Sequence, residues 1–342
     1  MKSFYTFCHL SGPSGCPLAT STSTVEDIEK RVQGIIQSLY HHPIALDSPF
    51  GPEVFTYTDM RGIIFSALYS PTLAFGAVAG ILAAVENGGG DYLEQIAMVL
   101  HDNNVYTCGE DRMADLRTEV PTQAILCGES VDQTALSQHG FEEYWHLLSG
   151  ISPAAGSIWA MLKMKCAAWP IRAVYGLGGS DDNFGGNTSH PILFISNTAD
   201  PVTPLKSGRH MSERFPGSAL LIQDSAGHCS NAAPTPCTLK AIREYFQTGA
   251  LPHKDTVCIP PSSPNSLNST DPDSPFYDPS LGQGTFLTAE NMGEEMEAAK
   301  ELQALKAKFP YFGKDILGQR VQDMLLSAVE FHADSTIREK EL

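Results

Sequence analysis

Two short apolar runs constrain the fold of this chain more than any other feature of its sequence. They lie at residues 191–197 (PILFISN) and 218–224 (SALLIQD), and a segment with helical spacing, 205–215, separates them. Strands that are apolar on both faces belong inside a sheet covered by helices, and a strand–helix–strand order joins neighbouring parallel strands. The sequence therefore predicts the end of an α/β domain, with a further helix at 238–246.

The first 120 residues are predicted to be mostly helical. The tetrapeptide TVED, which begins at Thr24, is typical of a helix N-terminus, and apolar residues then recur every three to four positions as far as Leu39. We also expect helices at 59–69, 73–86, 141–148 and 158–169 and a short buried strand at 123–130 (QAILCGES).

Composition and pattern divide the chain into four regions. A mostly helical region, 1–122, precedes the α/β part, 123–258. Residues 259–287 are rich in Pro, Ser, Asn and Asp and have little to bury, so they predict a flexible linker. Residues 288–342 predict a helical acidic tail, which we interpret as an accessory segment rather than an interaction module.

Charge and hydropathy limit the possible partners. Lys and Arg total 22 against 39 Asp and Glu, giving a net charge of −17, which disfavours binding to nucleic acid or to an acidic membrane surface. Residues 62–85 carry no charge over a length that could span a bilayer, but Pro71 interrupts them. We therefore expect two packed helices there, and neither a nucleic-acid nor a membrane partner.

The cysteines and the N-terminus give conflicting indications of location. Eight cysteines and two glycosylation sequons, at Asn187 and Asn268, are typical of a secreted protein. However, the first sixteen residues have no uninterrupted apolar core, so they predict no signal peptide. Two interpretations stay open: part of a secreted protein whose leader is not in this chain, or a cytosolic protein with buried thiols and chance sequons.

Two residues have the spacing of catalytic groups. Asp200 follows the first predicted strand and His228 follows the second. Ligands and catalytic groups gather at the carboxyl ends of parallel strands, so the two side chains can meet in one crevice. An Asp followed 28 residues later by a His matches the last two members of a Ser–Asp–His triad on an α/β-hydrolase sheet.

Other chemistries have weaker support. Cys229 adjoins His228, but we expect neighbouring side chains to point apart, which disfavours a Cys–His nucleophile. The pair His41-His42 has no third ligand at metal spacing, and no phosphate loop or dinucleotide fingerprint is present. We predict no cofactor and no metal site.

The amino-acid sequence around Asp200 and His228 resembles that of a known family. Residues 166–173 (CAAWPIRA), the stretch from NTSHPILFISNTADPVTP to DSAGHCS, and PCTLKAIREYFQTGALPHKDTVC, ending at Cys258, resemble the C-terminal domain of secreted tripeptidyl-aminopeptidase-like α/β-hydrolases. These are serine peptidases of the prolyl-aminopeptidase group. Weaker similarity at 7–19, 57–71 and 124–133 extends the resemblance to about residues 5–258. It implies a partial α/β-hydrolase fold with a helical cap in 1–122, a peptide substrate and an extracellular location.

The resemblance also assigns residues. Asp200 corresponds to the triad acid and His228 to the general base. It further suggests disulfides Cys8–Cys16 and Cys237–Cys258, with Cys127–Cys166 as a plausible third.

The family's nucleophile has no counterpart here. No G-x-S-x-G occurs in the sequence, and Gly12-Pro13-Ser14-Gly15, the nearest approach, follows no predicted strand. The family's early strands and nucleophile elbow would precede Met1. We therefore expect the chain to supply the acid and base but no serine nucleophile, and to be inactive alone. The missing N-terminal part of the hydrolase is a candidate partner. The alternative is a non-catalytic relative that binds a peptide or protein.

Overall fold

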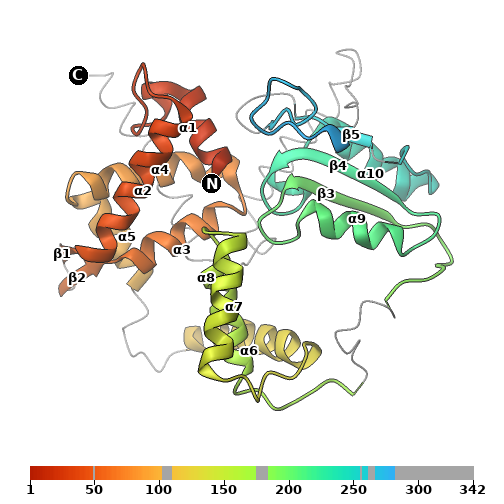
Figure 1. The fold of residues 1–342 in the computed structure, drawn as a ribbon, viewed down its shortest axis with the longest axis horizontal. Coiled ribbons are helices and arrows are strands. Elements are labelled where there is room, and N and C mark those ends of the chain that lie inside the picture. Colours follow the sequence, from red (N-terminus) through yellow and green to blue (C-terminus); the bar gives the residue numbers. More distant parts are fainter. Residues whose placement is uncertain (49–50, 102–109, 175–183, 255, 261–265, 282–342) are drawn as a thin grey trace. The chain divides into compact units, whose positions relative to one another are not determined.

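The chain forms two compact units in a computed structural model. The structure describes residues 1–48, 51–101, 110–174, 184–254, 256–260 and 266–281. One unit takes in 1–101 and the chain from 186 onward, and the other is 102–185 (Figure 1). This division does not follow the boundary expected between residues 122 and 123. The expected acidic tail, 288–342, lies outside the described residues.

Helices dominate the first 101 residues. They are α1 (Lys2–Gly15), α2 (Val25–His41), α3 (Tyr57–Ala67), α4 (Pro71–Glu86) and α5 (Asp91–His101). The predicted start of α2 is confirmed: Thr24 Oγ1 accepts a hydrogen bond from the Asp27 N–H at 3.1 Å, and Asp27 Oδ2 accepts one from the Thr24 N–H at 3.0 Å. An antiparallel hairpin, β1 (Ile44–Ser48) and β2 (Gly51–Phe55), was not predicted.

The uncharged segment folds as two helices, as its proline predicted. α3 ends at Ala67, and Pro71 is the first residue of α4, where its missing N–H costs nothing. Among the described residues no single helix is long and apolar enough to cross a membrane. α4 together with Asp91–Met98 passes by length and composition alone, across a bend of 117°.

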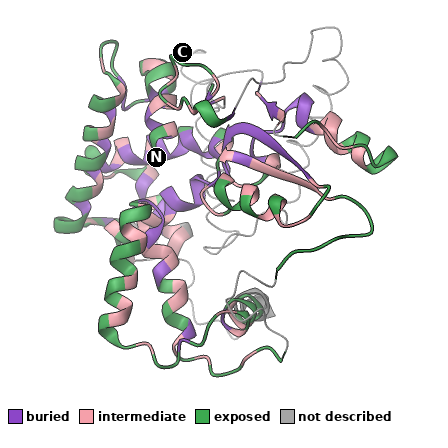
Figure 2. Ribbon diagram, turned by 45° about the vertical axis from the view of Figure 1, so that its right-hand side comes forward, coloured by how far each residue is buried: buried purple, intermediate pink, exposed green. Residues whose placement is uncertain are grey.

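The predicted parallel crossover is confirmed in the second part of this unit. β3 (Leu193–Ala199), α9 (Leu205–Glu213), β4 (Ala219–Ala226), α10 (Pro236–Thr248) and β5 (Thr256–Cys258) follow in sequence. The sheet order is β3-β4-β5, all parallel, and every residue of β4 is buried (Figure 2). The architecture is that of a partial α/β-hydrolase fold. This part of the unit also contains two short 3-10 helices, η3 (Ser230–Ala232) and η4 (Pro279–Leu281).

Alternate residues of β4 face two separate apolar layers. Leu220 and Ile222 pack with Val257 and Leu281 and contact Leu205 of α9. Leu221 packs on the other side with the half-cystines Cys237 and Cys258 and contacts Ala241 of α10. The period of two along the strand thus sends neighbouring side chains to helices on opposite faces of the sheet.

Part of the expected flexible linker is packed instead. Ser266 forms a bridge with Ser225, and the Ser269 N–H donates to the buried Asp224 carboxylate at 2.7 Å. Leu267 and Leu281 are 4% and 1% exposed. Two leucines and one buried carboxylate therefore fix residues 266–281 against β4, although the segment's average composition is that of a linker.

The second unit, 102–185, contains α6 (Glu110–Glu129), α7 (Gln138–Ile151) and α8 (Gly156–Cys166). The strand predicted at 123–130 is wrong, because these residues form the last turns of α6 and the following bend. Ile125 and Leu126 are 60% and 40% exposed, so the apolar run does not enter a sheet. A short apolar run cannot be distinguished from part of a helix by its periodicity alone.

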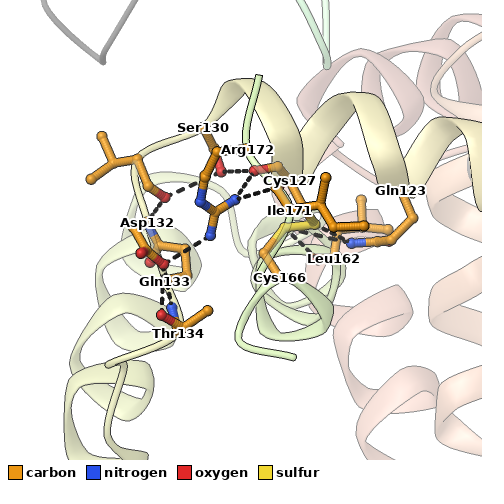
Figure 3. Close-up of a disulfide and its surroundings, with 11 residues drawn as sticks. Gln123, Cys127, Ser130, Asp132, Gln133, Thr134, Leu162, Cys166, Ile171 and Arg172 are labelled. Atoms are coloured by element: carbon orange, nitrogen blue, oxygen red, sulfur yellow. Dashed lines mark hydrogen bonds and ion pairs between the residues drawn. A yellow bond between two sulfur atoms is a disulfide. The ribbon is translucent and has the colours of Figure 1, made fainter. Parts of the chain in front are cut away.

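The three disulfides implied by the resemblance are all present. Cys8–Cys16 closes the end of α1, Cys127–Cys166 joins α6 to α8, and Cys237–Cys258 joins α10 to β5. Beside the second bridge, Arg172 donates to the Cys127 carbonyl and to Asp132 (Figure 3). This arrangement fixes the chain that leaves α8 against the end of α6.

Candidate active site

Asp200 lies directly after β3, in a turn built around its own carboxylate. Its Oδ1 accepts hydrogen bonds from the backbone N–H groups of Val202 and Thr203, both at 2.8 Å. The Thr203 hydroxyl donates to Oδ2 at 2.9 Å. Pro204 then caps α9, so the turn leads straight into the crossover helix. The side chain is only 2% exposed.

His228 follows β4 and meets this carboxylate. Its Nδ1 lies 3.0 Å from Asp200 Oδ1 and 3.1 Å from Oδ2. A carboxylate accepts and does not donate, so Nδ1 carries the proton. The Cys229 N–H donates to the same Oδ2 at 3.1 Å. The strand topology thus brings the two residues singled out in the sequence into direct contact.

The loop that carries His228 needs a glycine at residue 227. Gly227 has φ +114°, and a Cβ placed there would lie 2.6 Å from the Ala232 Cβ and 2.9 Å from the Pro71 Cδ. This backbone conformation is strained for any other residue. The close approach of Pro71 shows that the helical part of this unit packs directly against the loop.

Tyr69, between α3 and α4, supports His228 from the helical side. Its carbonyl accepts the His228 N–H at 3.0 Å, and the two rings pack edge to face with centroids 5.1 Å apart. The tyrosine is 7% exposed. No sequence pattern marks this hydrogen bond, because a backbone carbonyl carries no side-chain signature.

The two groups shift each other's proton affinity in opposite directions. Burial acts to raise the pKa of Asp200, but hydrogen bonds from His228 and from the backbone of Thr203, Val202 and Cys229 outweigh it and lower that pKa. The hydrogen bond to Asp200, followed by one to Cys229, raises the pKa of His228 to about 9 against desolvation. The pair is therefore carboxylate and imidazolium at neutral pH.

Cys229 lies next to the pair. Its thiol is free and exposed, and its interaction with His228 contributes to the raised pKa of the imidazole. Its φ of +64° is unusual for a residue with a side chain. That Cys229 is not a nucleophile stays a prediction.

Ser225 in β4 and Ser14 in α1 both lie within regular secondary structure. Ser225 is fully buried within β4 and accepts a hydrogen bond from Gln223. Ser14 lies in the last turn of α1, not between a strand and a helix. Among the described residues no cluster of three or more His, Cys, Asp or Glu could hold a metal ion. Asn187 and Asn268, the two sequon residues, are both exposed, and their glycosylation stays a prediction.

Comparison with known proteins covers the part of the chain that carries this pair. Residues 152–258 match a family described as TAP-like protein. The tripeptidyl aminopeptidases of Streptomyces coelicolor and Streptomyces lividans are each 27% identical over 106 residues. That alignment takes in 31% of this chain and 19% of each relative, so the chain matches only about a fifth of their length.

Proposed function

We propose that this chain, which is similar to TAP-like proteins over residues 152–258, carries the acid and base of a serine-type peptidase. The observation that carries the proposal is the contact between His228 Nδ1 and the Asp200 carboxylate at the carboxyl ends of adjacent parallel strands. In α/β-hydrolase triads the acid likewise precedes the histidine in the chain.

The geometry assigns each group one task. The Asp200 carboxylate holds the proton on Nδ1, which leaves Nε2 with a lone pair when the ring is neutral. Nε2 then takes the proton of an attacking serine hydroxyl while the serine oxygen bonds to the scissile carbonyl carbon. When the C–N bond breaks, the same nitrogen returns the proton to the leaving amine. Water repeats the sequence to release the acyl group.

The proposed substrate is a peptide cleaved near its free N-terminus. We infer this substrate class from the relatives, which are named tripeptidyl aminopeptidases. The triad alone does not choose between an ester and an amide, since acyl transfer uses the same groups for both.

The nucleophile is proposed to come from polypeptide outside these 342 residues. The sequence has no G-x-S-x-G, and the described serines near the pair are buried or lie in helices. Within the described part of the chain β3 pairs only with β4, so its other edge is open to a further parallel strand. A hydrolase segment ending in a nucleophile elbow is the partner that fits this edge.

A co-expression experiment tests the proposal. The chain is produced alone and together with the N-terminal segment of a Streptomyces relative that carries an elbow serine. We then measure hydrolysis of a tripeptide anilide and labelling by a fluorophosphonate. We expect both signals only from the pair, their loss in His228→Ala, and their retention in His190→Ala, a change at an exposed histidine in the same unit.

Two results contradict the proposal. Labelling of the chain alone would reveal a serine nucleophile within it. Hydrolysis that survives His228→Ala at the original rate would remove the base from the mechanism, since loss of a triad member costs several orders of magnitude.

An extracellular location is proposed on separate grounds. Three disulfides are typical of an oxidising compartment, and both sequon asparagines are exposed. Secretion from a eukaryotic host followed by endoglycosidase treatment should lower the mass at Asn187 and Asn268. An unchanged mass would leave the sequons as chance matches.

A further inference from the structure

We infer that Asn197 is a positioning residue that holds the His228 loop through the two carbonyls on either side of the histidine. The inference rests on the proposed function, because it matters for catalysis only if His228 is the base. Asn197 lies in β3, three residues before Asp200, and is completely buried.

Both N–H bonds of the Asn197 amide are directed at this loop. Nδ2 donates to the Gly227 carbonyl and to the Cys229 carbonyl, each at 2.8 Å. These carbonyls belong to the residues directly before and after His228. An amide nitrogen has two protons, so one side chain fixes the backbone on both sides of the histidine.

A second amide fixes the orientation of the first. Gln223, the partner of Asn197 across β3 and β4, donates through Nε2 to Asn197 Oδ1 at 3.2 Å. The same nitrogen contacts Ser225 Oγ and the Ser230 carbonyl, both at 3.0 Å. With its oxygen held by Gln223, the Asn197 amide can present only its N–H groups to the loop.

The strand geometry aims the amide at that point. Pairing between β3 and β4 is regular as far as Asn197 and Gln223, then shifts before Ala199 and Ala226. Such an irregularity near a strand end redirects the side chains beside it. Here it lies between the residue that holds the histidine loop and the turn that carries Asp200.

No other side chain of this size reproduces the contact. Aspartate has the same shape, but its oxygens would face two carbonyl oxygens, and even when protonated it donates only once. Leucine fills the space but donates to neither carbonyl, which leaves the buried Gly227 carbonyl without this donor. In either variant the loop loses a restraint on the distance between His228 Nδ1 and Asp200.

The test measures the imidazole of His228 by NMR titration of the full chain. In the unaltered protein this imidazole should titrate at about 9, the pKa that contact with Asp200 and Cys229 gives it. In Asn197→Asp and Asn197→Leu we expect its proton affinity to fall at least about tenfold, one pKa unit, and the Nδ1 proton signal to broaden.

Thr198→Val supplies a matched control on the next residue of the same strand. The Thr198 hydroxyl donates to Asp224 Oδ1 at 2.9 Å and to the Gln223 carbonyl at 3.3 Å, not to the His228 loop. Thr198→Val therefore also removes inner hydrogen bonds of β3, but none that holds residues 227–229. We expect it to leave the titration of His228 unchanged.

The outcomes separate this inference from the proposed function. An unaltered protein whose His228 titrates near 6.5 would refute the acid–base pair itself. A normal His228 in folded Asn197 variants, or an equal shift in Thr198→Val, would overturn the role of Asn197 alone. If both Asn197 variants fail to fold while Thr198→Val folds, Asn197 serves stability rather than positioning, and the inference is also overturned.

Discussion

Replacing Asp200 by asparagine tests the central contact most directly. Asparagine keeps the shape of the side chain, and its carbonyl oxygen can still accept the N–H groups of Val202 and Thr203. What disappears is the negative charge facing the imidazole, together with the Oδ2 acceptor of the Thr203 hydroxyl and the Cys229 N–H. We expect Asp200→Asn to fold and to lower the pKa of His228.

The size of the effect follows from the structure. The pKa of His228 is about 9 against an ordinary 6.5, and the hydrogen bond to Asp200 is the largest cause of the rise. This difference of roughly 2.5 units corresponds to roughly 3 kcal/mol, at ~1.36 kcal/mol per unit. Because the His228 side chain is 24% exposed, solvent screens part of this interaction, and about 2 kcal/mol is a realistic value.

The same shift makes stability depend on pH. A histidine whose pKa is raised on folding stabilises the native state fully below its unfolded pKa of about 6.5 and loses that contribution as the pH rises through about 9. The free energy of unfolding of the unaltered protein should therefore fall by about 2 kcal/mol between pH 6 and pH 10 through this group. Asp200→Asn should lose most of that dependence.

Histidine NMR titration and urea unfolding at the two pH values are the assays. Cys229→Ser serves as the matched control, because the thiol is the second cause of the raised pKa and should account for the smaller part of the shift. A His228 pKa that moves by less than about 0.3 units in Asp200→Asn would refute the reasoning. A larger shift in Cys229→Ser than in Asp200→Asn would refute it too.

Three further changes probe the surroundings of the pair. Gly227→Ala should disturb the His228 signal and cost more stability than Gly217→Ala in urea unfolding: both glycines have positive φ, but a Cβ at residue 217 meets nothing within 4 Å. Ile222→Ala, at a fully buried position of β4, should cost about 2–5 kcal/mol in the same assay, and a cost below about 1 kcal/mol would contradict the two-layer core. Iodoacetamide on the native, unreduced protein should alkylate Cys229, detected by peptide mass spectrometry, and a protected thiol would contradict its exposure.

The sequence predicted those features that depend on local chemistry or on topology. Thr24 signals a helix start because its partner Asp27 is only three residues away. Asp200 and His228 could be paired without coordinates because parallel strands joined by a helix leave their carboxyl ends side by side. Neither inference needed to know how any side chain packs.

The missed features depend on contacts between distant residues. Leu267 and Leu281 lie in a segment of linker composition, and only the buried Asp224 and the face of β4 give them a place to pack. The apolar residues at 125 and 126 suggested a strand, yet the helix that contains them continues. Asn197 donates to two backbone carbonyls and Tyr69 accepts through its own, and a carbonyl is the same in every residue.

The hydrogen bonds around Asp200 also bear on which member of the Asp200–His228 pair can transfer protons. Its two oxygens accept from the N–H groups of Val202, Thr203 and Cys229, from the Thr203 hydroxyl and from His228 Nδ1. A carboxylate offers about four lone-pair positions, so none is left for a substrate or a water molecule. Such saturation favours the charged form, which the lowered pKa reflects. In the proposed mechanism Asp200 therefore orients and stabilises the imidazolium without exchanging protons with a substrate, and all proton transfer is assigned to His228 Nε2.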